Sequence, residues 1–519
     1  MANRYWVNGT GNWSDTAHWS ISSGGSSGAS VPAITDDVFI TSLSGLSGGT
    51  ITFDMGYGEL GPVMHNLLCN SGHSYTLAKS GQGSGPQIYG SAEFEAGITW
   101  PGTFGVAFKA ADLGHTVKTN GMVFGKGVSF YGAGGGWTLL DNLTGNDLFN
   151  VFGGTFDAND FNITAKAIQF DIWDSGDTIV YMGDGTWTAT GNDTNTSWGN
   201  FTTFTNYGSW GDYLVTVYCE GSTIKFTDST ANPKTFYIND TATDPYNNLW
   251  LTGNGTGEFI IESEGSITFN EFRIDTPPHT LKFQNGTTTY VSSFIANGTV
   301  GNPITIDSGT FHYAPPAPSG IETITNGTFD SNINGWTPDY IYSNGTFSWS
   351  AGKAAVTGGT GPGIIITQTG LSLNWTGSYN IEFDYVITAG AAPNPGFHST
   401  IDNMNYGLSS LTNVGTHWTG RVDFTGLTGI VDIFELWFAL GDIGTVDNVS
   451  VQEIVLPSRG ILSKPSGIVS RDYLDISNSK AIGGATWYAG SHSNDTTNND
   501  GWIFTDPTWY NKGNFLGLF

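Results

Sequence analysis

Short alternating segments separated by tight turns fill most of this chain, and this pattern restricts its fold more than any other feature. From Tyr5 to Thr310, apolar and polar residues alternate over short stretches that end at Gly, Asn or Asp. Trp137–Leu139 follows the glycines of Gly134–Gly136, and Leu281–Phe283 precedes Asn285. Period-2 alternation between turn residues predicts β-strands, and almost no stretch has sustained helical periodicity. The sequence therefore predicts an all-β protein.

Two architectures fit many short strands with close turns: a parallel β-helix (a solenoid) and an array of stacked sandwiches. The β-helix is favoured because turn residues recur along the sequence without obvious domain breaks. The composition agrees with extensive β-structure. Charged residues make up only 12% of the chain, so Ser, Thr, Asn and Gly must cover the exposed strand faces and turns. Aromatic residues make up 14%, which is too much apolar area for a disordered chain.

A proline-rich segment, FHYAPPAPSG, interrupts this pattern. Prolines stop sheet pairing and stiffen a connection, and the turn-rich pattern resumes only after residue 457. We therefore expect a β-helix in residues 1–310, a linker at 311–320, an inserted β-sandwich jelly roll at 321–455 and the C-terminal continuation of the β-helix at 456–519.

The charge and hydropathy of the chain exclude some classes of partner. The net charge is −28, from 17 basic and 45 acidic residues, and no run of Lys or Arg could neutralise phosphates, so we expect no nucleic-acid partner. No segment approaches the roughly 20 apolar residues of a membrane span, so we expect no membrane insertion. The opening MANRYWVNGTGNW lacks the basic and apolar regions of a signal peptide.

The two cysteines, Cys69 and Cys219, lie far apart in the sequence. We expect two buried free thiols. A disulfide between them is the alternative that the sequence leaves open.

Three segments resemble a family of phage-encoded β-helical virion proteins, described as minor structural, tail or fibre proteins. They are the opening Arg4–Pro32, the stretch GNPITIDSG at Gly301–Gly309, and Asp472–Phe504 near the end. The resemblance implies a virion protein that is made in the host cytoplasm and released outside the cell by lysis, with other virion proteins as partners. By analogy at the level of the fold, it also implies a homotrimer.

The inserted segment resembles the jelly-roll carbohydrate-binding families that accompany many glycoside hydrolases. Asn326–Asp330 (NGTFD) matches their first strand, and Asp447–Val451 (DNVSV) matches their last. The resemblance implies a structural calcium held by Asp330 and Asp447, and oxygen ligands of this kind suit a hard cation. The alternative is that both aspartates cap turns without a metal.

A sugar-binding surface needs an exposed aromatic face and fixed polar groups. In the strand expected at residues 432–439, Phe434, Leu436 and Phe438 share one face and are expected in the core. Glu435 and Trp437 then share the opposite face, which suits a sugar platform. Further aromatic candidates for sugar contact are Trp349, Tyr406 and Trp418.

The sequence carries no convincing catalytic signature. Paired carboxylates can cleave glycans, but the acidic clusters here are more typical of solvated turns. The nine His residues form no zinc motif, and the glycine-rich segments lack the ending of a phosphate loop. We therefore assign no catalytic residue. The acidic residues considered for catalysis are Asp171, Asp174 and Asp177 around Trp173, and Glu262 with Glu264.

The expected function is that of a phage virion structural protein, a decoration, fibre or tail component, that adheres to glycans through the inserted jelly roll. Two alternatives remain open. The first is a tailspike-type glycan depolymerase, and the second is a purely architectural virion protein without sugar binding.

Overall fold

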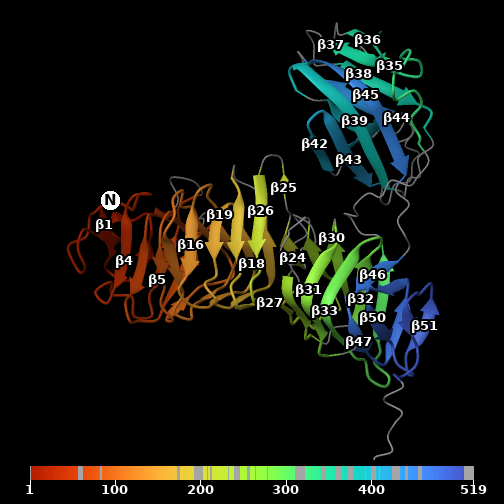
Figure 1. Cartoon of the computed structure of the whole chain (residues 1–519). Coiled ribbons are helices and arrows are strands. Elements are labelled where there is room, and N and C mark those ends of the chain that lie inside the picture. Colours follow the sequence, from red (N-terminus) through yellow and green to blue (C-terminus); the bar gives the residue numbers. More distant parts are fainter. Residues whose placement is uncertain are drawn as a thin grey trace, which may run out of the picture. The chain divides into compact units, whose positions relative to one another are not determined.

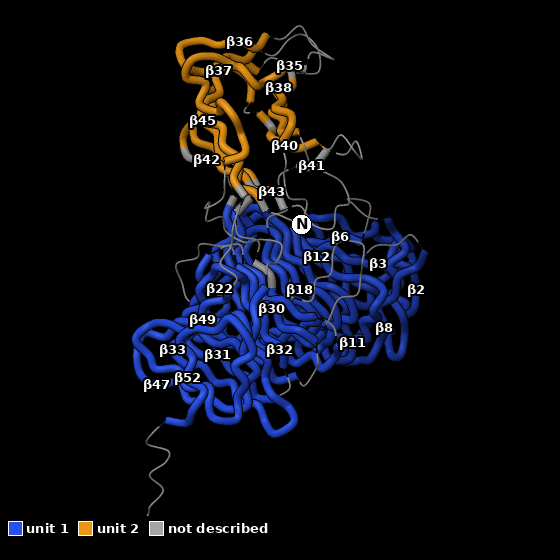
Figure 2. The backbone as a smooth tube through the Cα atoms, turned by 90° about the vertical axis from the view of Figure 1, so that its right-hand side faces the viewer, with its two compact units in different colours: residues 1–314, 458–519 blue, residues 315–457 orange. Residues whose placement is uncertain are grey.

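The structure is a computed structural model, and it describes most of the chain. The described residues are 2–56, 62–81, 85–171, 176–191, 203–206, 209–210, 213–231, 233–238, 246–253, 257–263, 265–276, 279–309, 322–339, 346–357, 364–371, 378–391, 393–398, 405–407, 410–423, 433–438, 442–453 and 459–507. The linker predicted at 311–320 lies outside them. The chain divides into two compact units, Met1–Ala314 with Ser458–Phe519 and Pro315–Pro457 (Figure 2).

The first unit is a parallel β-helix, which confirms the predicted fold class (Figure 1). Its first long sheet has 11 strands, and all neighbours are parallel except the two terminal pairs, β1 with β3 and β25 with β26. In spatial order the strands are β25 (Ser209–Trp210), β26 (Tyr213–Tyr218), β22 (Thr178–Tyr181), β19 (Gly154–Asp157), β16 (Gly136–Leu139), β13 (His115–Lys118), β10 (Ala92–Glu93), β7 (Leu67–Asn70), β4 (Asp37–Thr41), β1 (Asn3–Trp6) and β3 (Trp19–Ser20).

The second long sheet has 13 strands, all paired in parallel. They are β51 (Asn494–Thr497), β48 (Leu474–Ser477), β34 (Ile304–Gly309), β32 (His279–Gln284), β30 (Glu258–Ser263), β28 (Lys234–Ile238), β24 (Thr203–Asn206), β21 (Ala167–Phe170), β18 (Leu148–Val151), β15 (Val128–Phe130), β12 (Val106–Phe108), β9 (Gln87–Ile88) and β6 (Val63–Met64).

The third long sheet has 10 parallel strands, and two short parallel sheets complete the β-helix. The third sheet contains β14 (Val123–Phe124), β17 (Leu143–Gly145), β20 (Ile163–Ala165), β23 (Thr186–Ala189), β27 (Thr223–Phe226), β29 (Tyr246–Leu251), β31 (Ile267–Ile274), β33 (Thr288–Ala296), β46 (Gly460–Ser463) and β49 (Ser479–Ile482). The short sheets contain β11 (Ile98–Thr99), β8 (Tyr75–Lys79), β5 (Thr50–Phe53) and β2 (Gly11–Asn12), and β47 (Gly467–Ser470), β50 (Ala485–Tyr488) and β52 (Trp502–Ile503).

The β-helix continues across the inserted unit. Strand β33 pairs in parallel with β46, and β34 pairs in parallel with β48. The two partners in each pair come from opposite sides of the insertion in the sequence. Residues before and after the insertion therefore stack as neighbouring rungs of one solenoid.

Aromatic side chains fill the interior of the β-helix because every second residue of a strand points inward. Trp187 of β23 is fully buried, and its indole N–H donates to the carbonyl of Met182 at 3.0 Å. The rings of Phe149 and Phe170 lie 5.7 and 5.6 Å from its ring. Edge-to-face packing of this kind stabilises the interior beyond the gain from removing apolar area from water.

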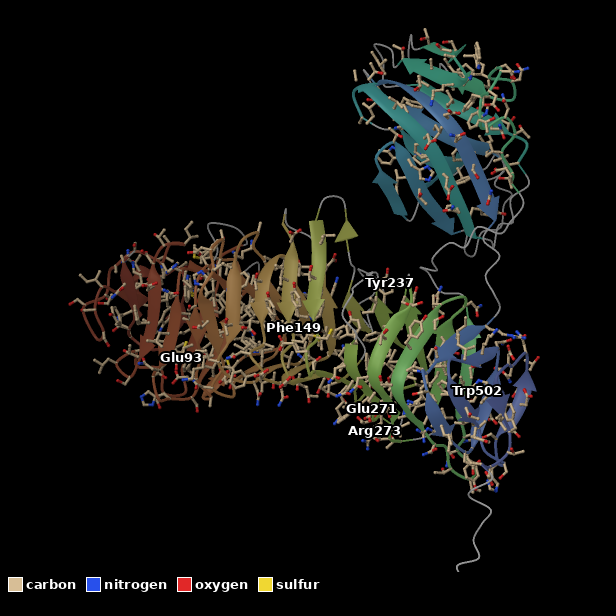
Figure 3. The ribbon with its side chains drawn as sticks, viewed as in Figure 1. Glu93, Phe149, Tyr237, Glu271, Arg273 and Trp502 are labelled. Atoms are coloured by element: carbon tan, nitrogen blue, oxygen red, sulfur yellow. The ribbon has the colours of Figure 1, made fainter. Side chains whose placement is uncertain are left out.

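Outward-facing side chains connect neighbouring rungs. The indole N–H of Trp250 donates to Glu271 at 3.0 Å, and the guanidinium of Arg273 lies 5.4 Å from the ring of Trp250. Figure 3 labels Glu271 and Arg273 on this part of the β-helix. Cys69 and Cys219 are buried and form no disulfide, as predicted. The one helix among the described residues is the short 3-10 helix η1 (Thr16–His18), so none there is long and apolar enough to span a membrane.

A buried histidine makes the β-helix sensitive to acid. His279 of β32 is buried, and its Nε2 has no hydrogen-bond partner among the described residues. Burial lowers the pKa of His279 below its ordinary value of 6.5, nearby Lys234 lowers it further, and hydrogen bonds to the backbone of Gly253 and Thr276 oppose the shift. The folded state therefore binds this proton less readily than the unfolded chain does.

We expect this histidine to cost stability as the pH falls below about 6.5. Each pH unit removes up to about 1.4 kcal/mol until the folded-state pKa is reached. Between pH 7 and pH 5, the melting temperature measured by calorimetry should fall less for the His279→Gln variant than for the unmodified protein. The exposed His73 supplies a control: His73→Gln should keep the full acid sensitivity, and equal sensitivity of all three proteins would contradict the prediction.

The second unit is a jelly roll of two antiparallel sheets, as predicted. The five-stranded sheet has the order β35 (Thr337–Asp339), β38 (Ile364–Thr369), β44 (Ile433–Phe438), β40 (Asn394–His398) and β41 (Asn405–Gly407). The six-stranded sheet has the order β36 (Thr346–Ser350), β37 (Lys353–Thr357), β45 (Ile443–Glu453), β39 (Ser378–Ala389), β43 (His417–Asp423) and β42 (Ser410–Val414). A core that includes Phe383, Phe397 and Val451 joins their inner faces.

Candidate functional site

The outer face of the five-stranded sheet carries the clearest candidate binding surface among the described residues of the jelly roll. On its central strand β44, Phe434, Leu436 and Phe438 are buried in the core, as predicted from their alternation. Trp437 lies on the opposite face and keeps 44% of its surface exposed. We call this surface the Trp437 face, and by register it comprises Ile365, Thr367, Thr369, Gly396, His398, Ile433, Glu435 and Trp437.

A hydrogen bond fixes the tryptophan on this face. The indole N–H of Trp437 donates to Oε2 of Glu435 at 2.9 Å, and Glu435 itself is only 9% exposed. Glu435 lies between Thr367 of β38 and Gly396 of β40. Two residues that share a face at positions i and i+2 can touch in a strand. The carboxylate therefore holds the orientation of the indole ring.

Two of the remaining aromatic candidates, Trp349 and Trp418, lie on the other sheet and do not join Trp437. Trp349 lies on β36 of the six-stranded sheet, where it pairs with the buried Ala354, and its indole N–H donates to the carbonyl of Phe329 at 2.7 Å. It is also 44% exposed. Trp418 lies on β43 of the same sheet. Its ring stacks on the buried Phe383, with centroids 6.1 Å apart and planes 6° apart, so it packs on the core.

Tyr406 lies on β41, an edge strand of the five-stranded sheet. Its backbone pairs with Phe397 of β40. Its side chain lies outside the described part of the structure, so its predicted sugar contact stays a prediction.

A polar network on the outer face of the six-stranded sheet was not predicted. Asp384 of β39 accepts a hydrogen bond from Asn448 at 2.7 Å and lies 2.9 Å from Nδ1 of His417. Burial acts to raise the pKa of Asp384, but the hydrogen bonds from Asn448 and His417 outweigh it and hold the pKa below its usual value. The network joins three strands through residues up to 64 positions apart, which no local sequence signal encodes.

The two aspartates predicted to hold calcium have partners of their own. Oδ2 of Asp447 lies 3.1 Å from the ammonium of Lys353, and its Oδ1 accepts from the backbone N–H of Asn448 at 2.9 Å. Asp330 accepts from the hydroxyl of Thr328 at 3.0 Å. These contacts fit the alternative in which both residues cap turns. A calcium ion there would compete with Lys353 for Asp447.

Calcium at Asp330 and Asp447 therefore stays a prediction with a direct test. Bound calcium would raise the melting temperature of the protein, because a ligand that binds only the folded state stabilises it. EDTA should reverse the rise, and Lys353→Met should strengthen the calcium response by removing the competing ammonium. Melting curves that are unchanged by calcium in both proteins would leave the aspartates as turn caps.

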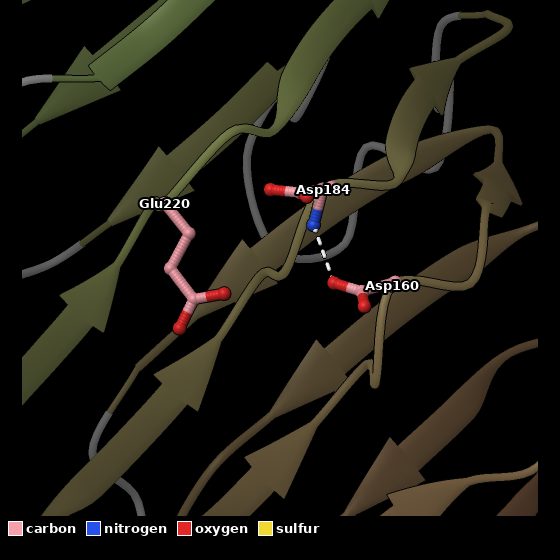
Figure 4. Close-up of side chains that lie close together, drawn as sticks. All are labelled: Asp160, Asp184 and Glu220. Atoms are coloured by element: carbon pink, nitrogen blue, oxygen red, sulfur yellow. Dashed lines mark hydrogen bonds between the residues drawn. The ribbon is translucent and has the colours of Figure 1, made fainter.

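The β-helix contains an acidic group that the sequence analysis missed. Among the described residues, Asp160, Asp184 and Glu220 are the one set of three potential metal ligands whose ligand atoms lie within 4.8 Å of one another, and all three are exposed (Figure 4). Oδ1 of Asp160 accepts from the backbone N–H of Asp184 at 2.8 Å, and Oδ1 of Asp184 accepts from the backbone N–H of Gly221 at 3.1 Å.

These hydrogen bonds give the acidic group a structural role. Asp160, Asp184 and Glu220 follow the neighbouring strands β19, β22 and β26, so they occupy the same turn of successive rungs. Each aspartate caps a backbone donor in the next rung that would otherwise need water. The signal in the sequence is an acidic residue repeated two or three positions after each of these strands.

The acidic residues considered for catalysis are only partly described. Oδ1 of Asp177 accepts from the backbone N–H of Leu214 at 3.0 Å, and Oδ2 of Asp171 accepts from Gln169 at 3.1 Å. Glu262 is buried in β30. Trp173, Asp174 and Glu264 lie outside the described residues, and the depolymerase alternative is therefore untested by geometry.

No known family model and no curated protein sequence match the chain. Among solved structures, one described as "CBM4 structure and function" is 23% identical over 25% of this chain and 99% of its own, with a TM-score of 0.21. The CBM22-1 xylan-binding domain of Paenibacillus barcinonensis Xyn10C is 11% identical over 27% of this chain and 97% of its own, with a TM-score of 0.21.

The enzymatically active domain of bacteriophage CBA120 tailspike protein 4 is also similar. It is 14% identical, and the match covers 80% of this chain and 64% of that one, with a TM-score of 0.19. These are distant similarities of fold. The functional argument therefore rests on the side chains of this chain.

Proposed function

We propose that this protein binds glycans through the Trp437 face of its jelly roll. The observation that carries the proposal is the half-exposed indole of Trp437, held on an outer sheet face by its hydrogen bond to Glu435. A fixed aromatic ring offers a flat apolar surface to the C–H groups of a sugar. Thr369 adds a hydroxyl to the same face, and the hydroxyl of Thr367, which donates to the carbonyl of Thr337 at 3.2 Å, can still accept a hydrogen bond from a sugar hydroxyl.

The β-helix would serve as the structural part of a phage virion component, a decoration, fibre or tail protein. This part of the proposal is supported by the resemblance of Arg4–Pro32, Gly301–Gly309 and Asp472–Phe504 to phage-encoded virion proteins. Single sugar contacts are weak, but many copies on one particle would add up to firm adhesion. Other virion proteins would be its assembly partners, and it would act outside the cell after host lysis.

We propose adhesion without cleavage. Two of the described acidic residues considered for catalysis accept hydrogen bonds from neighbouring groups: Asp171 accepts from Gln169, and Asp177 accepts from the backbone N–H of Leu214. The bond to Leu214 gives Asp177 a role in joining its segment to strand β26. A glycan depolymerase would instead need two carboxylates that face one substrate at a fixed separation.

The test is incubation of the purified full-length protein with a panel of bacterial surface polysaccharides. Retention of at least one polysaccharide without new reducing ends is the expected result. New reducing ends would favour the depolymerase, and mutation of the acidic residues one by one would follow. If nothing is retained and nothing is cut, the purely architectural alternative replaces the proposal.

A further inference from the structure

We infer that Glu435 makes the Trp437 face selective for neutral glycans over anionic ones. This inference rests on the proposed function and adds to it the chemical class of the ligand. The five strands that build the sheet carry acidic residues but no Lys or Arg. Their acidic residues are Asp339 and Glu435.

The position of Glu435 gives its charge an effect on any ligand that stacks on Trp437. Its carboxylate accepts from the indole N–H at 2.9 Å and is largely screened from water by its neighbours. A charge with little water around it acts over a longer distance than an exposed one. By register, His398 of β40 lies beside Ile433, two positions before Glu435 on the same face.

A uronate, sulfate or phosphate group on a bound sugar would therefore meet the like charge of Glu435, and the five strands offer no Lys or Arg to offset it. At a separation of roughly 7 to 10 Å, the repulsion should lower affinity about 3- to 10-fold at low salt. Neutral hydroxyls carry no such cost. The net charge of −28 acts in the same direction for the whole protein.

Glu435 also positions the ring, and the two roles can be separated. The side-chain oxygen of glutamine can accept the same hydrogen bond from Trp437, so Glu435→Gln removes the charge and keeps the position of the indole. Glu382 offers a matched control. It lies on β39 of the other sheet, it is partly exposed, and Glu382→Gln changes the net charge by the same amount.

The experiment uses the polysaccharide that the full-length protein retains best, before and after partial carboxymethylation. Affinity electrophoresis at low salt should show about 3- to 10-fold weaker binding to the carboxymethylated polymer. Glu435→Gln should remove most of this difference without changing the affinity for the neutral polymer by more than about twofold, and Glu382→Gln should leave the difference in place. Raised salt should strengthen binding of the unmodified protein to the carboxymethylated polymer alone, because it screens the repulsion.

Several outcomes would overturn the inference while leaving glycan binding intact. They are equal affinity for both polymers, a best-retained polymer that is itself anionic, equal effects of the two variants, or loss of neutral binding in a folded Glu435→Gln protein. The comparison of the two polymers at low salt needs no variant, so equal affinity would contradict the inference even if Glu435→Gln fails to fold. If no polysaccharide is retained at all, the proposed function fails first and this inference fails with it.

Discussion

Replacement of Trp437 by alanine is expected to weaken glycan binding by roughly 10- to 100-fold and to leave the protein folded. Stacking of a sugar buries roughly 100 Å² of the indole, which is worth about 2.5 kcal/mol before the costs of ordering. The free energy of unfolding should fall by only about 1 to 3 kcal/mol, the cost of leaving the largely buried carboxylate of Glu435 without its indole donor, because nearly half of the side chain of Trp437 is already exposed. Affinity electrophoresis and a melting curve measure the two quantities on the same protein.

Trp349 supplies the matched control for this experiment. It has the same exposed fraction, 44%, but its indole donates to the carbonyl of Phe329 and its strand belongs to the other sheet. Trp349→Ala should cost about 1 to 3 kcal/mol of stability, because a partly buried carbonyl loses its donor, and should keep glycan affinity. The opposite result, with binding lost at Trp349 and kept at Trp437, would move the binding surface to the six-stranded sheet.

Replacement of Trp187 by alanine is expected to destabilise the β-helix by about 3 to 5 kcal/mol. The substitution leaves a cavity where the ring contacts Phe149 and Phe170, and it removes the donor to the carbonyl of Met182. Parallel rungs on both sides of β23, in β20 and β27, restrict how far the site can collapse. The measurement is the urea concentration at the midpoint of unfolding, with circular dichroism as the probe.

Thr188 is the control for this substitution. It lies next to Trp187 on the same strand but points away from the buried interior. Thr188→Ala should shift the urea midpoint only slightly, because surface substitutions usually change stability by less than about 0.5 kcal/mol. Similar losses for both variants would contradict the assignment of Trp187 to the interior of the solenoid.

The fold class and the central strand of the Trp437 face could be predicted from local patterns. Alternating segments between Gly and Asn turns predicted strands, and their unbroken succession predicted a β-helix. The alternation of Phe434, Leu436 and Phe438 with Glu435 and Trp437 predicted which face of β44 is exposed. In each case the information lies within a few neighbouring residues.

The features that the sequence could not show depend on pairing between distant strands. Trp349 and Trp418 were expected to contact sugar as Trp437 does, but they pair with Ala354 and Phe383, two residues that point into the core from the other sheet. The capping of Gly221 by Asp184 requires knowing which turns stack on each other. Because the repeat is too degenerate to count rungs, this stacking cannot be read from the sequence alone.

The most direct test of the central claim is hydrogen–deuterium exchange of the full-length protein with and without a retained polysaccharide. Binding to the Trp437 face predicts slower exchange of backbone amides in β38, β40 and β44, and unchanged exchange in β39 and β43. Protection confined to β39 and β43, or to the strands of the β-helix, would contradict the assignment of the glycan site to the Trp437 face.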